Sequence, residues 1–472
     1  MEQLTAGLPT IAYDTAGPRD MLKAELPELL VPSGEIESFG AALARVLQLE
    51  AGAYAQLAER SAPVGATFRW SEIAEATLDS YQQLLRGTEN PILFVQPFSV
   101  GSAGGGARIL RALLEQAPMA WQSVCSAPAK PRPWPNEVHI RSRPSWGRID
   151  HSRLAALPHL TKRFFAGRFR RELRQCSVRL GAQAIHAVPH GGLDFAVAQS
   201  VAQELSLPFF ISLHDDLAYT AEHGVQPAVR EAAMRSAWQE VAARFVISER
   251  LGQEYCRRYG VRDFAVVTDG LARLAAPRAI ASSGTLRLYF MGLFHLAYEQ
   301  NLRALLEGVA AFEQENPTTG VTVTLRCEHV RPQVYAGVKE VTVLPFAEEA
   351  QVRRDLEEAD LLYMPLPFGE EHGNFARYSL STKMVTYVGS GVPILYHGPT
   401  SSAAYDLLDQ HQAAVLLATL APGEIARKLG ELTAEERTQV ATNALALAAR
   451  EFMLEEQTRR FWDTMAACLT RG

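Results

Sequence analysis

One stretch near the end of the chain decides the fold: Met384-Val385-Thr386-Tyr387-Val388-Gly389-Ser390-Gly391-Val392-Pro393-Ile394-Leu395. A similar stretch, Met1-Glu2-Gln3-Leu4-Thr5-Ala6-Gly7-Leu8-Pro9-Thr10-Ile11-Ala12, opens the chain, and Gly17-Pro18 then matches Gly398-Pro399. Each copy continues through helical segments to an aromatic helix, over Phe68–Leu85 in one and Phe452–Met465 in the other. We therefore expect residues 1–86 to repeat the last part of the chain, so that the chain begins inside one domain and ends at the matching point of a complete one.

Composition describes an ordinary globular protein. Of the 472 residues, 47% are hydrophobic and 21% are charged, which is enough to bury a large core. The net charge of −6 argues against general nucleic-acid binding, and no run approaches the roughly 20 apolar residues of a membrane span. Five scattered cysteines without metal-ligand spacing are typical of a reducing compartment. We expect a cytoplasmic protein without a metal site.

Short apolar runs alternate with helical stretches in two series, as in doubly wound parallel sheets. An Ala-, Ser- and Pro-rich linker, Ala272–Gly284, separates the series, and Arg86–Pro91 is a polar hinge before the first. The runs are Ile92–Val95, Ala184–Val188, Phe209–Leu213, Arg244–Ile247 and Ala265–Val267, then Leu286–Met291, Val321–Leu325, Val341–Leu344, Leu361–Met364 and Val392–Leu395. The pattern predicts an α/β chain with two Rossmann-like domains facing a cleft, 87–278 and 279–450, preceded by a partial Rossmann half-domain, 1–86, and followed by a helix, 451–472, that packs back on the first domain.

A glycine-rich turn, Gly101-Ser102-Ala103-Gly104-Gly105-Gly106, lies between the first strand and its helix. Glycines let the backbone approach a ligand closely, and the N-terminus of the following helix favours an anion. Gly105 and Gly106 are therefore candidate donor-binding residues. A plain tight turn is an equally good interpretation of this motif.

A second motif, Ile211-Ser212-Leu213-His214-Asp215-Asp216, ends a strand where open α/β sheets place their sites. His214 is a candidate catalytic residue that polarises a hydroxyl or a leaving oxygen, and Asp215 is a candidate carboxylate that fixes its tautomer. The alternative is a histidine that satisfies local backbone groups.

Two further motifs lie in the second series. Met291-Gly292-Leu293-Phe294-His295 is a strand ending in a glycine turn, in which Gly292 and His295 are candidate donor-binding residues. The alternative interpretation is a strand-to-helix turn that binds no ligand. After Pro365-Leu366-Pro367-Phe368-Gly369-Glu370-Glu371-His372 comes a predicted helix start at which Lys383 adds positive charge and could help hold a diphosphate. The candidate donor-binding residues here are Glu371, Ser379, Ser381, Thr382 and Lys383. The alternative is an ordinary capped helix with a solvated lysine.

These four motifs, in this order, resemble those of glycosyltransferases of the GT-B fold, and most of all those of glycosyltransferase family 4. The resemblance covers Asn90 to about Met465, and residues 1–85 resemble only the end of a second such enzyme. The most specific stretch is Ser379–Pro393, which is similar to a Ser-Leu-Pro-x-Lys segment that runs into a Gly-x-Pro strand in many bacterial members.

The resemblance implies a nucleotide-diphosphate sugar as co-substrate, bound mainly by the second domain. It also implies a glycan or lipid-linked acceptor, bound mainly by the first, and transfer with retention and without a metal or other cofactor. The setting implied is the assembly of surface polysaccharide or another glycoconjugate.

The chain departs from the family at several positions. Tyr378 and Thr386 stand where members typically carry two glutamates, and Leu293 and the stretch 298–301 replace an arginine and a lysine. His295 and Lys383 remain as candidate phosphate partners. A second hypothesis is therefore a catalytically weak or inactive GT-B module that binds a partner glycosyltransferase or a glycan, and a third is another GT-B chemistry such as sugar-nucleotide epimerisation.

A basic segment from Lys130 to Arg174 carries 12 Lys or Arg residues against 3 Asp or Glu. Part of it is a predicted helix with apolar residues on one side, among them Phe169, Leu173 and Cys176. One interpretation is peripheral contact with an anionic membrane or a lipid-diphosphate acceptor. The other is a solvated helix packed on the first domain.

Overall fold

The computed structural model describes residues 2–66, 74, 77, 90–127, 134–142, 157–190, 192–220, 226–277, 284–294, 296–327, 330–335 and 341–470. The chain forms two compact units, Met1–Glu89 and Asn90–Gly472. The expected aromatic helix over Phe68–Leu85 lies almost wholly outside the described residues, and so do most of the polar hinge, part of the interdomain linker and much of the basic segment.

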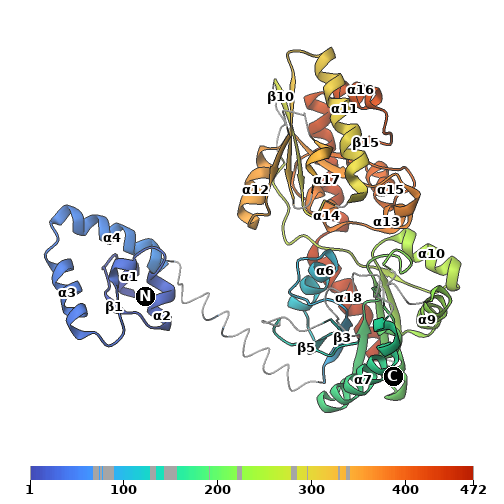
Figure 1. Ribbon diagram of the computed structural model, residues 1–472, viewed down its shortest axis with the longest axis horizontal. Helices are drawn as coiled ribbons and strands as arrows, with labels where there is room; N and C mark the ends of the chain where they lie inside the picture. The colour runs from blue at the N-terminus through green and yellow to red at the C-terminus, as the bar shows by residue number, and fades with distance from the viewer. Residues whose placement is uncertain are drawn as a thin grey trace. The chain divides into compact units, whose positions relative to one another are not determined.

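The first domain of the larger unit is built on a seven-stranded parallel sheet in the order β5-β4-β3-β6-β7-β8-β9 (Figure 1). Its central strands are buried along their whole length, as expected for a parallel sheet covered on both faces. The strands are β3 (Ile92–Gln96), β4 (Trp121–Cys125), β5 (Glu137–His139), β6 (Ala184–Ala187), β7 (Phe209–Leu213), β8 (Ala243–Val246) and β9 (Ala265–Val266). The helices are α6 (Gly105–Glu115), α7 (Leu157–Leu180), α8 (Asp194–Glu204), α9 (Pro227–Glu240) and α10 (Glu249–Tyr259).

The second domain has a six-stranded parallel sheet in the order β12-β11-β10-β13-β14-β15. Its strands are β10 (Thr285–Met291), β11 (Gly320–Arg326), β12 (Val341–Leu344), β13 (Leu361–Pro365), β14 (Ile394–His397) and β15 (Val415–Leu417). Its helices are η3 (Leu296–Tyr298), α11 (Glu299–Glu315), η4 (Pro332–Val334), α12 (Glu349–Glu358), η5 (Glu370–His372), α13 (Gly373–Tyr378), α14 (Thr382–Val388), α15 (Ala403–Gln410), α16 (Pro422–Glu431) and α17 (Ala434–Glu451). The expected pair of Rossmann-like domains is confirmed. Strand order reverses beside β3 and beside β10, and ligands of open α/β sheets bind at such points.

Apart from the short helix η1, the smaller unit repeats the element order at the end of the second domain. Its elements are α1 (Glu2–Thr5), β1 (Ala12–Tyr13), α2 (Ala16–Leu22), η1 (Pro27–Leu29), β2 (Leu30–Val31), α3 (Ile36–Leu47) and α4 (Ala51–Ala66). Strands β1 and β2 pair in parallel, as β14 and β15 do. Gly7 and Gly391 each precede the first of these strands with a positive φ, +75° and +70°, a conformation that favours glycine. The repeated sequence thus folds into a repeated run of elements.

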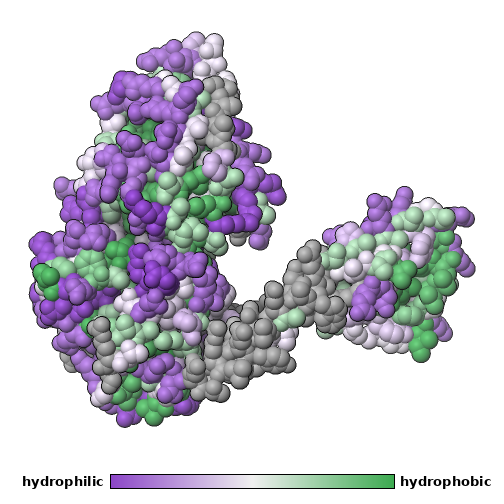
Figure 2. Space-filling view, turned by 180° about the vertical axis from the view of Figure 1, so that it is seen from behind, coloured by the Kyte–Doolittle hydropathy of each residue, from purple (hydrophilic) through white to green (hydrophobic). Residues whose placement is uncertain are grey.

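The smaller unit buries a small core and leaves other apolar side chains exposed. Leu4, Leu26 and Leu29 are buried in that core. Space-filling Figure 2 shows a broad hydrophobic area on this unit. The large exposed hydrophobic residues of the unit are Leu8, Ile36, Leu43, Leu47 and Tyr54. A two-stranded sheet is too small to cover the apolar faces of all its helices.

The last helix, α18 (Leu454–Leu469), returns to the first domain. A parallel bridge joins Met453 to Leu271, at the start of this return. Phe461 and Trp462 are buried in the core of the first domain, where Trp462 Nε1 donates to the carbonyl of Leu113 at 3.0 Å. The chain therefore crosses twice between the two domains of the larger unit.

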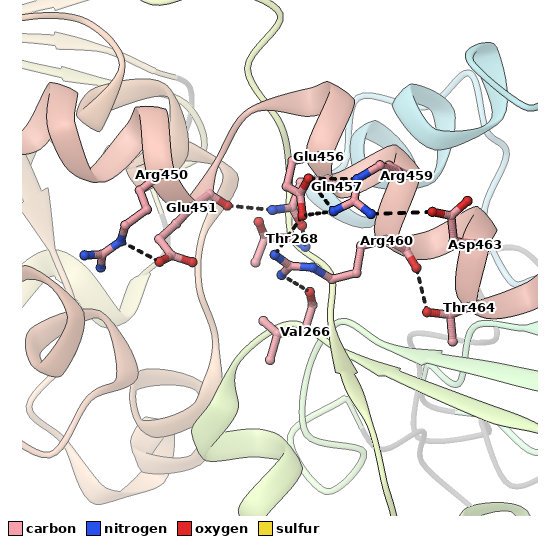
Figure 3. A network of polar contacts seen from close by, with 10 residues as sticks. All are labelled: Val266, Thr268, Arg450, Glu451, Glu456, Gln457, Arg459, Arg460, Asp463 and Thr464. Atoms are coloured by element: carbon pink, nitrogen blue, oxygen red, sulfur yellow. Dashed lines mark hydrogen bonds and ion pairs between the residues drawn. The ribbon is translucent and has the colours of Figure 1, made fainter.

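A polar network joins α18 to the end of β9 and to the residues that follow it, at this crossing (Figure 3). Gln457 Oε1 accepts from the backbone N–H of Thr268 at 2.9 Å, and its Nε2 donates to the carbonyl of Glu451 at 2.6 Å. Arg460 donates to the carbonyl of Val266 at 2.9 Å. Gln457 is 1% exposed, so these bonds replace ones that water would otherwise make.

From Leu157 onward, the basic segment lies in helix α7, which packs on the first domain. Phe169, Leu173 and Cys176 on α7 are buried in the core. Arg170 and Arg174 both pair with Glu204, at 3.0 and 2.5 Å. The structure therefore shows a helix packed on the first domain, which was one of the two interpretations of this segment. Contact with a membrane stays a prediction. Within the described ranges, none of the helices combines the length and apolarity that a bilayer crossing requires.

We predict that Gln457→Ala lowers the free energy of unfolding by about 1–3 kcal/mol, because it leaves the buried N–H of Thr268 without its acceptor. Urea unfolding followed by tryptophan fluorescence measures this change. The matched control is Gln439→Ala, which removes an exposed side chain of α17 that donates to Asn443 Oδ1 at 2.9 Å. An equal loss in both variants would contradict a special role for Gln457.

Candidate functional site

The glycine turn of the first domain reaches the second domain. Helix α6 begins after Gly104, which has no side chain to cap the free N–H groups of the first turn. A Cβ placed on Gly105 would lie 3.3 Å from Thr382 Cγ2, and one on Gly106 would lie 3.0 Å from His214 Nδ1. Glycine is therefore what allows this turn to approach both residues closely. In Figure 1, α6 and α10 lie on one side of the junction and α13 and α14 on the other.

His214 and Asp215 follow β7 and are half-buried at this junction. Burial lowers the pKa of His214 to about 4, aided by the nearby His190, so His214 is neutral at pH 7. Its Nδ1 is buried with no hydrogen-bond partner among the described residues. The alternative interpretation was a histidine that hydrogen-bonds to nearby backbone groups. His214 Nδ1 makes no such bond.

Asp215 pairs across the domain junction. Its Oδ1 accepts a hydrogen bond from Ser379 Oγ at 2.5 Å. The expected pairing with His214 is not made through His214 Nδ1, which has no partner among the described residues. Burial raises the pKa of Asp215 to about 6, although the Ser379 hydroxyl opposes this rise. Ser379 and Asp215 are thus brought together from separate domains.

Lys383 links the third and fourth motifs. Its Nζ lies 3.7 Å from the ring centroid of Phe290 and 5.4 Å from that of Tyr298. A Cβ placed on Gly292, whose φ is +100°, would lie 3.4 Å from Lys383 Cε. Burial lowers the pKa of Lys383 to about 7, so this lysine differs from the solvated one that the sequence left open.

The remaining predicted residues occupy different places. Ser381 caps α14 by accepting from the backbone N–H of Met384 at 3.2 Å, which is the capping role that the sequence offered as an alternative. The side chain of Glu371 is 82% exposed, and its Oε1 lies 3.3 Å from His372 Nε2. Glu371 is therefore a surface residue. His295 lies outside the described residues.

Arg108 is a residue of the junction that sequence reasoning missed. Its guanidinium pairs with Asp269 at 2.9 Å and donates to Thr386 Oγ1 at 3.2 Å. Thr386 is one of the two positions at which the resembled family carries a glutamate, so an arginine from the first domain contacts this position. An arginine in the first turn after a glycine-rich loop was the available signal.

Tyr378, at the other such position, lies beside two arginines. Its ring centroid lies 5.8 Å from the guanidinium carbon of Arg258 and 5.9 Å from that of Arg377. It lines a pocket of about 960 Å³ formed by α10, α15, α18 and their surroundings, with Arg250, Asp406 and Arg460 also in its wall. None of the predicted site residues lines this pocket.

We predict that the Lys383 amine becomes reactive toward an acylating reagent with a midpoint near pH 7, because burial favours its neutral form. Competitive labelling across a pH series, read by mass spectrometry of the peptide, measures the midpoint. A midpoint near the usual lysine value of about 10.4 would contradict the burial of this amine.

Comparison with known proteins shows the fold. No family model matches the sequence, and no curated protein sequence does. Sucrose-phosphate synthase from Thermosynechococcus elongatus is similar in structure, with a TM-score of 0.59 and 12% identity over 81% of this chain and 100% of that one. HepE from Anabaena in complex with UDP has a TM-score of 0.57 and 15% identity over 80% and 100%.

A third structure is titled trehalose-6-phosphate from E. coli bound with UDP-2-fluoro glucose. It has a TM-score of 0.54 and 10% identity over 80% of this chain and 98% of that one. At such identities the likeness is one of fold. The two Rossmann-like domains, joined by a double crossing of the chain, have the GT-B fold.

Proposed function

We propose that this protein is a glycosyltransferase that moves a sugar from a nucleotide-diphosphate sugar to a glycan or lipid-linked acceptor. One observation carries the proposal: all four sequence motifs meet at the junction. Gly105 lies against Thr382, Gly106 against His214, and Gly292 against Lys383. If the motifs were only a tight turn and a capped helix, there would be no reason for them to lie next to one another.

Lys383 and the glycine turn supply the groups that a diphosphate needs. A diphosphate beside Lys383 favours its charged form, so donor binding takes up a proton at pH 7 and above. The uncapped N–H groups at the start of α6 add donors without a charge of their own. In the transition state these groups stabilise the charge that develops on the departing diphosphate, without a metal.

His214 contacts the sugar in this proposal. A neutral imidazole donates or accepts a hydrogen bond with a hydroxyl at no cost of burying a charge. Asp215, held by Ser379, keeps the two domains in register beside it. Transfer with retention would have the acceptor hydroxyl attack on the face from which the diphosphate departs.

The nucleotides in two similar structures support the donor class. HepE was solved with UDP and the E. coli trehalose-6-phosphate protein with UDP-2-fluoro glucose. Applied to this chain, they favour a nucleoside diphosphate at Lys383. The assembly of surface polysaccharide or another glycoconjugate is the setting that we propose for the reaction.

The alternative function is a catalytically weak or inactive module that binds a partner glycosyltransferase or a glycan. The observation that favours it is the environment of Thr386, which contacts Arg108 in place of the glutamate of the resembled family. The contact of Tyr378 with Arg258, at the other such position, adds to it.

Calorimetric titration with a panel of nucleoside diphosphates separates the two functions. The transferase predicts binding of at least one nucleotide, weakened by Lys383→Ala about tenfold or more, since a hydrogen bond to a charged group contributes about 1.5–3 kcal/mol. Affinity of the unaltered protein should also fall as the pH rises above 7, because Lys383 loses its charge. Lys428→Ala, on α16, is the control.

Absence of binding by every nucleotide would count against the transferase and for the binding module. Equal affinities of the unaltered protein and Lys383→Ala would remove Lys383 from the donor site.

We predict that His214→Ala lowers the rate of sugar transfer by at least about tenfold and leaves nucleoside-diphosphate affinity unchanged, because His214 is assigned to the sugar and Lys383 to the diphosphate. Transfer from radiolabelled nucleotide sugars to a glycan mixture gives the rate, and calorimetry gives the affinity. Loss of both in the same variant would place His214 in a structural role.

A further inference from the structure

Three side chains of different chemistry meet at one edge of the first sheet, away from Lys383 and His214. Cys125 ends β4, and Glu137 and His139 begin and end β5. The strands pair in parallel with Cys125 opposite His139 and Ser123 opposite Glu137, so these residues share one face of the sheet. The thiol sulfur, one carboxylate oxygen and one ring nitrogen all lie within 4.8 Å of one another.

Glu137 and His139 lie within ion-pair distance of each other, but their facing atoms are not aligned for a hydrogen bond. His139 Nε2 lies 3.1 Å from Glu137 Oε1, and the two side chains are 8% and 0% exposed. Both atoms nevertheless lack an aligned hydrogen bond with any described residue. An ion pair joined by a good hydrogen bond would align the N–H with the oxygen. Misaligned atoms at this separation are placed as two ligands of one ion would be.

Outer contacts orient the same two side chains. His139 Nδ1 lies 3.2 Å from the carbonyl of Ala127, so Nδ1 is the protonated nitrogen and Nε2 carries the lone pair. Glu137 Oε2 accepts from the backbone N–H of Val100 at 2.7 Å and from Ser123 Oγ at 3.3 Å. These bonds occupy Oε2 and leave Oε1 available to a cation.

We propose that Cys125, Glu137 and His139 bind a divalent cation of the zinc type. A thiolate, an imidazole and a carboxylate are the ligands that zinc takes in proteins, and a thiolate selects against magnesium and calcium. Binding releases the thiol proton, which passes to solvent. The spacing Cys125-x11-Glu137-x-His139 carries no metal signature along the chain, because adjacent strands bring the ligands together.

The cation would hold the glycine turn in place. Glu137 fixes the N–H of Val100, and Gly101 and the rest of the turn follow directly. A cation on Oε1 would lock this carboxylate and with it the start of the turn. The site is separate from Lys383 and takes no part in the transfer chemistry, so it stands or falls independently of the proposed function.

The test uses the full chain, stripped with a chelator and titrated with Co²⁺ as the probe. We expect one equivalent to produce thiolate-to-cobalt charge-transfer absorption in the near ultraviolet. Cys125→Ser should abolish this absorption. His139→Gln should weaken binding by more than about 100-fold, since loss of an outer-shell partner alone costs ~10–100-fold. Cys256→Ser, a cysteine of α10 outside the cluster, should leave the titration unchanged.

A competing outcome is a buried imidazolium–carboxylate pair that binds no cation. In that case the unaltered protein shows no thiolate band with Co²⁺, and the proposal is wrong. A band that persists in Cys125→Ser would also overturn it. Circular dichroism checks that the variants fold, and Glu137→Gln, which still accepts from Val100, gives a second weakened binder if Cys125→Ser does not fold.

Discussion

The burial of Phe461 and Trp462 in the first domain is the interaction on which the rest depends. These side chains come from the last helix of a chain that has already completed the second domain. Their removal from water at the far end of the chain stabilises the second crossing, because apolar burial is the largest favourable contribution to folding. The buried Gln457 then fixes the position of that crossing against Thr268.

Removal of water at the junction also sets the charge states there. Burial lowers the pKa values of His214 and Lys383 to about 4 and about 7 and raises that of Asp215 to about 6. Each shift favours the neutral form, which is the effect of desolvation. The folded state loses stability from His214 as the pH falls from 6.5 toward 4, and from Asp215 as the pH rises from 3.8 toward 6. In the function that we propose, a diphosphate would favour the charged form of Lys383, so its binding would be coupled to proton uptake.

The two halves of the repeat show how context decides what a common element run becomes. In the second domain, β14 lies between β13 and β15 in a six-stranded sheet. In the smaller unit, β1 pairs with β2 alone, and apolar residues such as Ile36 and Leu47 stay exposed. A glycine with a positive φ, Gly7 or Gly391, precedes the first strand in both copies. That residues 1–86 come from a second glycosyltransferase remains our proposal.

The sequence by itself determined the fold class, because parallel strands buried on both faces are continuous apolar runs and leave a strong local pattern. It also placed the candidate residues after strands or near the starts of helices. Only the tertiary structure decided which of them meet. Ser379 contacts Asp215 from 164 positions away, Arg108 reaches Thr386, and Cys125 joins His139 across two strands. Such contacts depend on strand order and domain docking, which leave no periodicity along the chain.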